Sequence, residues 1–246
     1  MSSDAAWEPV RRVRTHEQVL AQIQQKILDG SLRAGERLPS ERELVGALGV
    51  SRTSVREALR ALEAMGIVEA RTGSGQDAGS VITGASTPAM TNLLRLHIAL
   101  ARISLSDLVE TRVELERSAA RGAADARTDE DVRHLTGLIE QMRSADSDHE
   151  SFNALDTEFH VSIARISGNA LAVDLMQALR GAVEHEMAQA FAEFDDWRAV
   201  ASGLVDEHEA IVRAIEDGRG DVAADLVADH ITSFYRGRVS GDDQSR

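Results

Sequence analysis

Residues 35–75 read GERLPSERELVGALGVSRTSVREALRALEAMGIVEARTGSG, and they carry the strongest structural signals of the N-terminal part of the chain. Ser40 and Glu43 have the spacing of a capping box, and the apolar series after them stops at Gly49, which predicts a short helix. A tight turn follows, and Ser51 is a favourable N-cap for a second helix. Two helices joined by a few residues that include glycine are typical of a helix-turn-helix.

The helix after Ser51 has one apolar and one polar face. Its apolar face, which we expect to be buried, consists of Val55, Ala58, Leu59, Leu62 and Met65. The first turns of the opposite face carry Arg52, Thr53, Ser54 and Arg56, at the place where a recognition helix meets base edges. Arginine can donate a fork of hydrogen bonds to guanine, and Thr and Ser suit bases or phosphates. A solvated arginine face without a ligand is the alternative.

Further elements are predicted on both sides of these two helices. Residues 15–30 place apolar side chains at helical spacing and end at a glycine, which predicts a preceding helix. The segments IVEAR at 67–71 and SVIT at 80–83 have strand character and are separated by a glycine-rich loop. The two strands predict a wing beside the helix-turn-helix.

The charge is distributed unequally along the chain. Residues 1–84 hold eleven Lys and Arg and eleven Asp and Glu, so this part has no net charge. Residues 85–246 hold 16 Lys and Arg and 30 Asp and Glu, which accounts for the whole formal net charge of −14. Clustered arginines in the neutral part attract DNA phosphates at close range. We therefore expect a DNA-binding domain at residues 1–84 and an acidic domain at residues 85–246.

Several classes of protein are excluded by composition. The chain has no cysteine, which excludes disulfides, thiolate nucleophiles and metals with sulfur ligands. It has no apolar run of roughly 18 residues, and its start lacks the apolar core of a signal peptide. We expect a cytoplasmic protein that does not contact membranes.

Residues 85–246 show no strand-like alternation and are expected to form an all-helical, antiparallel bundle. The predicted fold is thus mostly α-helical, with a small β wing in the N-terminal domain. The apolar periodicity predicts seven amphipathic helices, at residues 87–104, 105–127, 129–144, 149–166, 170–191, 197–217 and 220–238.

Four side chains of this bundle form a candidate metal site, namely Asp156, His160, His208 and His230. Asp156 and His160 are four residues apart and therefore share one helix face, beside apolar residues. Three imidazoles and one carboxylate on three helices suit a borderline divalent ion and leave coordination positions open. Capping or core hydrogen bonds are the alternative explanation for each histidine.

Arg112 is the second unusual residue of the bundle, because it lies on an apolar stripe with Leu108 and Leu115. An arginine in such a place is costly unless it meets an anion. The anion is either an organic acid or an acidic side chain such as Glu116, one turn further along the helix.

Residues 15–84 resemble the GntR family of regulators. The resemblance rests on PSEREL at 39–44, on SRTSVREAL at 51–59, and on the order of helix, helix, recognition helix and wing. It implies that the residues that approach DNA are Arg42, Arg52, Thr53, Ser54, Arg56, Thr72 and Gly73. The wing departs from the family's short basic form, because GSGQDAGSVIT is longer and carries Asp77.

The second part resembles the FCD ligand-binding domain of the FadR subfamily. Asp156 with His160, then Glu207 with His208, and finally His230 match the order of its motifs, and Gly168-Asn169 follows the first pair. The resemblance implies a divalent ion, zinc first and nickel or manganese as alternatives, on the four candidate ligands. It further implies an effector cavity that contains Arg112 and Asn169, in which a small carboxylate bridges Arg112 and the metal.

These features predict a homodimeric transcriptional regulator, a repressor that a small organic acid releases from operator DNA, and not an enzyme. A metal-dependent enzyme fused to a DNA-binding domain is the alternative. No histidine has a glutamate three residues before it, and H-E-x-x-H, G-x-S-x-G and P-loop patterns are absent from the sequence. A winged-helix protein that only organises DNA leaves the gathering of Asp156 and three histidines unexplained.

Overall fold

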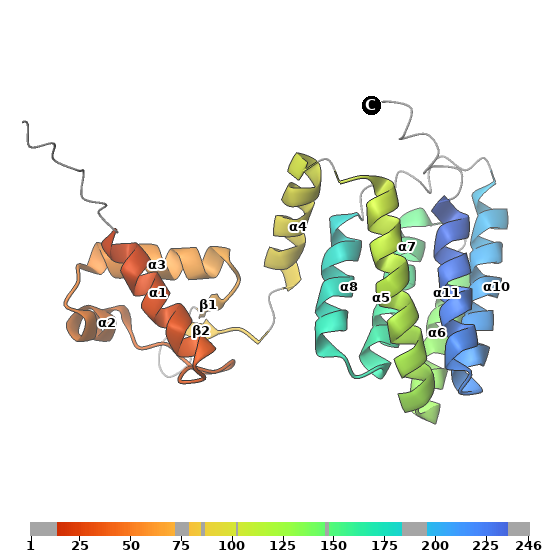
Figure 1. The fold of residues 1–246 in the computed structure, drawn as a ribbon, viewed down its shortest axis with the longest axis horizontal. Coiled ribbons are helices and arrows are strands. Elements are labelled where there is room, and N and C mark those ends of the chain that lie inside the picture. Colours follow the sequence, from red (N-terminus) through yellow and green to blue (C-terminus); the bar gives the residue numbers. More distant parts are fainter. Residues whose placement is uncertain are drawn as a thin grey trace, which may run out of the picture. The chain divides into compact units, whose positions relative to one another are not determined.

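The computed structural model describes residues 14–71, 79–84, 87–101, 103–145, 148–183 and 196–235 (Figure 1). The contacts divide the chain into two compact units between Ala89 and Met90. Each unit has its own hydrophobic core. The mostly helical fold with a two-stranded wing and a helical bundle agrees with the sequence prediction.

The N-terminal unit is a winged helix-turn-helix. It consists of α1 (Thr15–Leu28), α2 (Glu41–Leu48), α3 (Arg52–Ala64), β1 (Val68–Arg71) and β2 (Gly79–Ile82). The strands are antiparallel, with Val68 opposite Ile82. On its other side β2 pairs with the segment around Arg37, which forms a bridge with Val81. The wing therefore lies against the chain that enters α2.

The capping residues of the helix-turn-helix behave as their sequence predicts. The side chain of Ser40 accepts from the backbone of Glu43, and the carboxylate of Glu43 accepts from the backbone of Ser40, which fixes the start of α2. Gly49 ends α2 with a φ of 64°, a left-handed conformation that glycine adopts without strain. Ser51 caps α3. The predicted apolar face of α3 is buried except for Met65, which lies after the end of the helix and is exposed.

The C-terminal unit is a bundle of helices. The described residues form α4 (Thr87–Ala101), α5 (Leu105–Ala126), α6 (Asp129–Ser144), α7 (His149–Ile166), α8 (Ala170–Ala182), α10 (Trp197–Glu216) and α11 (Gly220–Tyr235). Helix α5 is central and contacts α7, α8, α10 and α11 (Figure 1). Glycine allows one of these approaches, because a Cβ atom at Gly122 of α5 would lie 2.9 Å from Cβ of Ser167.

The helix boundaries differ from the predicted ones most at the ends of α4 and α8. Helix α4 ends before the predicted residue 104, because the side chain of Ser104 caps α5 by accepting from the backbone of Asp107. Helix α8 ends at Ala182, with Val183 as its C-cap, and not at the predicted residue 191. Residues 184–195 and the predicted end of the last helix at residue 238 lie outside the described ranges.

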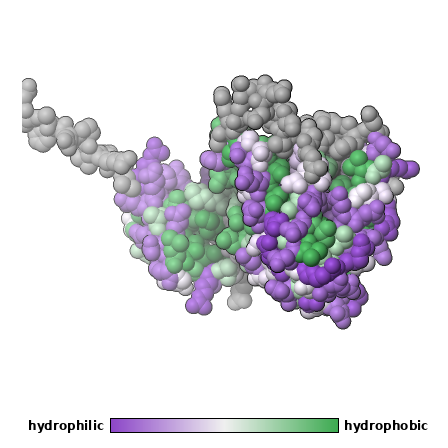
Figure 2. All heavy atoms as spheres, turned by 45° about the vertical axis from the view of Figure 1, so that its right-hand side comes forward, coloured by the Kyte–Doolittle hydropathy of each residue, from purple (hydrophilic) through white to green (hydrophobic). Residues whose placement is uncertain are grey.

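The surface of the bundle in view in Figure 2 is largely hydrophilic, in line with its acidic composition. Helix α4 differs, since Leu93, Leu96 and Leu100 are all more than half exposed. None of the helices in the described ranges is long and apolar enough to cross a membrane.

Candidate DNA interface and candidate metal centre

The predicted DNA-contacting residues lie at the exposed side of the helix-turn-helix. Arg52 and Thr53 are exposed in the first turn of α3, and Arg42 is exposed on α2. Ser54 is half-buried, and its hydroxyl lies 2.9 Å from the hydroxyl of Ser51, so this side chain also supports the cap of α3. The structure therefore leaves the two arginines and Thr53 accessible to a ligand.

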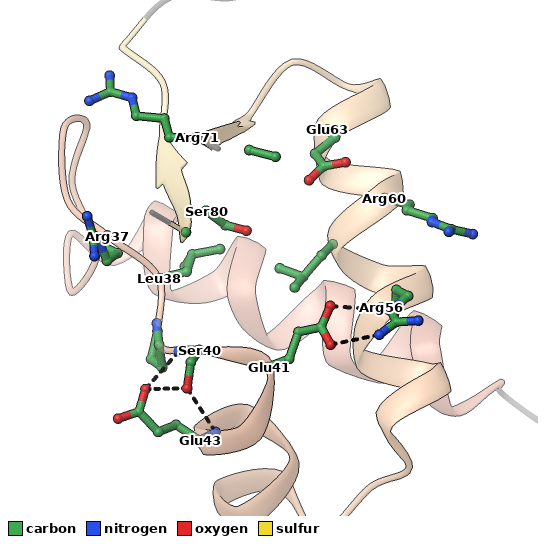
Figure 3. A pocket seen from close by; sticks show the side chains of 14 residues that line it. Arg37, Leu38, Ser40, Glu41, Glu43, Arg56, Arg60, Glu63, Arg71 and Ser80 are labelled. Carbon is green, nitrogen blue, oxygen red and sulfur yellow. Dashed lines mark hydrogen bonds and ion pairs between the residues drawn. The ribbon is translucent and has the colours of Figure 1, made fainter. Parts of the chain in front are cut away.

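A groove lies between α3, the start of α2 and the wing, with a volume of about 550 Å³ (Figure 3). Its charged lining residues are Arg37, Glu41, Glu43, Arg56, Arg60, Glu63 and Arg71. Both walls carry arginine, a side chain suited to DNA phosphates. The predicted wing-tip residues Thr72 and Gly73 lie outside the described residues.

Arg56 is held at this groove by Glu41 of α2. Nε of Arg56 donates to Oε1 of Glu41 at 3.3 Å, and Nη2 donates to Oε2 at 3.2 Å. These hydrogen bonds and the charge of Glu41 raise the pKa of Arg56. The pair connects the two helices of the helix-turn-helix (Figure 3).

In the C-terminal unit, the structure brings the four predicted metal ligands together. Asp156, His160, His208 and His230 are all buried, and their candidate ligand atoms lie within 4.8 Å of one another. They come from α7, α10 and α11. The predicted convergence of three helices on one point is therefore present in the fold.

Carboxylates orient two of the three imidazoles from outside the cluster. Nδ1 of His160 lies 2.5 Å from Oε2 of Glu116, and Nδ1 of His230 lies 2.6 Å from Oε2 of Glu207. Metal-binding histidines are commonly oriented in this way, with one ring nitrogen on a carboxylate and the other on the ion. Both contacts leave Nε2 as the nitrogen available to the centre of the cluster.

Unpaired nitrogen atoms show that this cluster fits a metal ion. Among the described residues, Nε2 of His160 and both ring nitrogens of His208 are buried without a hydrogen-bond partner. Nε2 of His208 does lie 3.2 Å from Oδ1 of Asp156, but it does not form a hydrogen bond there. Buried polar atoms are rarely left unpaired. A divalent ion bound by these nitrogens and by Asp156 would satisfy them.

The acidic and basic groups around the cluster balance one another. Burial would raise the pKa of Asp156, but Arg180 and then His160 hold it well below its ordinary range. Burial likewise opposes ionisation of Glu116, whereas His160, Arg180 and Arg112 hold its pKa well below the usual value. Both carboxylates are therefore ionised. Burial, with His230 close by, lowers the pKa of His208 to about 3, so this imidazole is neutral and able to bind a metal.

Arg112 is buried beside the cluster, and the predicted alternative contact with Glu116 is present. Its Nε and Nη2 donate to Oε1 of Glu116 at 3.1 and 3.0 Å, and Nη1 donates to the hydroxyl of Tyr235 at 3.0 Å. A cavity of about 20 Å³ adjoins these groups. Its lining includes Arg112, Asp156, Leu204, His230, Phe234 and Tyr235. The structure thus places Arg112 and two candidate metal ligands on one cavity.

Asn169 is not among these residues. It is exposed and caps α8, where its Oδ1 accepts from the backbone nitrogen of Ala172. Arg180, which contacts the cluster, lies eleven residues further along α8, a distance of about 16 Å along the helix axis. The predicted contact of Asn169 with an effector therefore has no support from its position.

Arg180 was not predicted as a site residue, although, like Arg112, it is an arginine on an apolar helical stripe. Arg180 follows Met176 and Leu179 on an apolar stripe, and it is buried. Its Nη1 donates to Oδ2 of Asp156 at 2.7 Å, and its Nη2 lies 3.6 Å from Oε1 of Glu116. The contacts of Glu116 with His160 and of Glu207 with His230 join different helices, and no local pattern reveals them.

Comparisons with protein families match both units. The family described as bacterial regulatory proteins of the gntR family matches residues 15–76. The FCD domain matches residues 107–233, which contain all four candidate metal ligands. The two matches cover the helix-turn-helix with its first strand and most of the helical bundle.

Individual relatives agree over most of the chain. The transcriptional repressor NanR of Cronobacter sakazakii is 30% identical over 92% of this chain and 86% of its own length. A putative L-lactate dehydrogenase operon regulatory protein of Escherichia coli is 30% identical over 90% of this chain and 85% of its own length. The solved structure of Streptococcus agalactiae GntR has a TM-score of 0.63 and 28% identity, and covers 90% of this chain and 99% of that one.

These relatives are named as transcriptional regulators and not as enzymes, in agreement with the sequence prediction. Together with the winged helix-turn-helix and the buried Asp156 cluster, they assign both halves of the molecule. The chain belongs to the GntR family, in its FadR-like subfamily with a C-terminal FCD domain, and is a DNA-binding transcriptional regulator.

Proposed function

We propose that this regulator is a homodimeric repressor that a small organic acid, bound beside a divalent metal ion, releases from a two-fold operator. Residues 1–84 bind the DNA, and residues 85–246 bind the metal and the acid. The observation that carries the proposal is the convergence of Asp156 and three histidines, with buried imidazole nitrogens that lack partners.

The donor set favours zinc, with nickel or manganese as alternatives. Three imidazoles and one carboxylate are ligands that a borderline divalent ion accepts, and a four-ligand set leaves room for an exogenous oxygen. When bound, the ion supplies a Lewis-acid site for a carboxylate oxygen. The chain's own contribution is to orient His160 through Glu116 and His230 through Glu207.

Arg112 supports a carboxylate as the effector. It is buried next to the cluster and shares a cavity with Asp156 and His230. The cavity of about 20 Å³ holds about one water molecule, so an acid enters only if a lining side chain moves. Tyr235 is the side chain to be displaced, because its hydroxyl occupies Nη1 of Arg112. A carboxylate on Arg112 would take its place.

Two features support a homodimer. Helix-turn-helix proteins reach two half-sites about one DNA turn apart by pairing two copies. In addition, the row formed by Leu93, Leu96 and Leu100 on α4 is exposed, and an apolar row of this kind is suited to burial against a second copy. A change in the pairing of the effector domains would then move the recognition helices away from their half-sites.

The test uses a duplex selected by the metal-loaded protein from a library of random sequences. L-lactate is the first acid to be titrated against the complex, because a relative is named for an L-lactate dehydrogenase operon, and succinate and citrate follow. We expect one of these acids to release the duplex, as measured by fluorescence anisotropy. Arg112→Ala should lose this response while it retains the metal and the duplex.

The reciprocal measurement is a control for the mechanism. If the acid weakens binding of the duplex by some factor, the duplex must weaken binding of the acid by the same factor. If the Arg112→Ala variant releases the duplex at the same acid concentration as the parent, Arg112 does not bind the acid and only forms its salt bridge with Glu116. Failure of all three acids to act on the parent would contradict the proposed effector class.

A further inference from the structure

Arg56 and Arg60 are one turn apart on α3 and both line the groove, but their surroundings differ (Figure 3). Glu41 binds Arg56 through two hydrogen bonds. Among the described residues, no hydrogen bond or ion pair holds Arg60, whose side chain points away from Glu41 in Figure 3. The guanidinium of Arg56 is therefore fixed in orientation, whereas that of Arg60 is free to turn.

Glu41 binds one edge of the Arg56 guanidinium and leaves a second edge free to bind another acceptor. A guanidinium has five N–H donors in a planar arrangement. Glu41 accepts from Nε and Nη2, which form the side edge. The end edge, formed by Nη1 and the second hydrogen of Nη2, remains available. It is a two-donor fork of the kind that binds O6 and N7 of guanine.

The two arginines also differ in how strongly they attract a DNA phosphate. Glu41 neutralises Arg56, so the pair gains little from a phosphate, whose binding depends on net positive charge. Arg60 keeps its full charge for such a contact. The pair contributes little to folding, because the two side chains are 53% and 38% exposed. Its position at the groove is thus better explained by DNA recognition than by stability.

We propose that Glu41 is a positioning residue for sequence recognition, which fixes the guanidinium of Arg56 so that its end edge meets a base, while Arg60 binds a phosphate. The inference concerns only the DNA interface and does not depend on the metal or the effector. It assigns roles to Glu41 and Arg60, to which the sequence alone assigns none.

The experiment measures discrimination between two duplexes. The parent protein first selects a duplex from a library with a random segment of about 20 base pairs, and a shuffled duplex of equal composition is the comparison. The ratio of the two dissociation constants is then measured for Glu41→Gln. We expect this ratio to fall about tenfold. Binding to the shuffled duplex should stay the same or become tighter, because a negative charge is removed from the groove.

Glu63→Gln is the matched control, because Glu63 lines the same groove and its side chain forms no hydrogen bond or ion pair among the described residues. It makes the same change of charge and should leave the ratio within about twofold of the parent. Arg60→Ala should weaken binding to both duplexes equally. The loss of one phosphate contact should also make the slope of log K against log salt concentration less steep by about 0.9. Unchanged melting temperatures of the variants would exclude a structural effect.

The double variant Glu41→Gln/Arg56→Ala shows whether Glu41 acts through Arg56. If it does, Glu41→Gln has no further effect on the ratio once Arg56 is alanine. The proposal is wrong if Glu41→Gln alone leaves the ratio within about twofold of the parent. It is also wrong if Glu41→Gln lowers the ratio as much in the Arg56→Ala background as in the parent.

Discussion

Arg180 and His208 contact opposite oxygens of one buried carboxylate. Nη1 of Arg180 donates to Oδ2 of Asp156 at 2.7 Å, and Nε2 of His208 lies 3.2 Å from Oδ1. Arg180 therefore fixes the rotation of Asp156 so that one oxygen faces the histidines. Outer partners of this kind orient the ligands of metal sites.

Substitution of Arg180 is expected to weaken metal binding, although Arg180 is not itself a candidate metal ligand. Arg180→Met should lower the affinity for zinc by about 10- to 100-fold, because Asp156 loses the partner that orients it. Competition with a chromophoric chelator measures this affinity. Arg165→Met is the control, since Arg165 forms an exposed ion pair with Glu158. Equal affinities for zinc in the Arg180 variant and the parent would show that Asp156 needs no orientation.

Glu116 is expected to be a major determinant of the stability of the metal-free protein. Its carboxylate contacts Arg112 and His160 and is 2% exposed. Glu116→Gln leaves buried charge without its partner and should lower the free energy of unfolding by about 3–5 kcal/mol. Glu114→Gln, an exposed change on the same helix, should alter it by no more than about 0.5 kcal/mol. Urea denaturation in the presence of a chelator measures both, and similar values for the two variants would contradict the ion-pair account.

The metal-free protein is expected to lose stability as the pH falls below about 6.5. The pKa of His208 is lowered to about 3 from its ordinary value of 6.5. Between these values the unfolded chain binds a proton at His208 and the folded chain does not, so acid favours unfolding. The loss from this group is at most about 1.4 kcal/mol per pH unit. Asp156 and Glu116, whose pKa values are lowered, add to the loss only at about pH 4 and below.

The contribution of His208 is isolated by a variant. The free energy of unfolding of the parent and of His208→Gln is compared by urea denaturation between about pH 7 and pH 5. The parent should lose more stability over this range than His208→Gln. Identical pH dependence of the two proteins would show that the pKa of His208 is not lowered in the folded state.

Arg52 is expected to contribute to sequence discrimination. It is exposed at the first position of α3, and no ion pair holds it among the described residues. Arg52→Ala should cost about 1–3 kcal/mol in binding of the selected duplex and less in binding of a shuffled one. A gel-shift titration with both duplexes measures this difference. Equal losses on the two duplexes would make Arg52 a phosphate contact.

The residues that local patterns predicted well are those whose position depends on one helix. Ser40 and Ser51 cap the helices that their sequence context predicted. Asp156 and His160 share a face because four residues make about one turn. His208 lies three and four residues after Val205 and Leu204 on the apolar face of α10, and it is fully buried.

The partners of these residues could not be predicted, because they lie on other helices. The contact of Glu207 with His230 joins α10 to α11, and that of Arg180 with Asp156 joins α8 to α7. Single-helix periodicity indicates that a side chain is buried but not which charge it meets. The register between helices is set by packing over the whole bundle, for example by the small residues of α5.

The metal content of the purified protein shows whether Asp156, His160, His208 and His230 form a metal centre. The chelator-treated protein is reloaded with zinc, dialysed and measured by elemental analysis. We expect about one ion per chain in the parent and loss of that ion in His208→Ala/His230→Ala. The control is His97→Ala/His134→Ala, which removes two exposed histidines and should keep the ion. Equal zinc content in the parent and in His208→Ala/His230→Ala would contradict the assignment of the buried cluster as a metal centre.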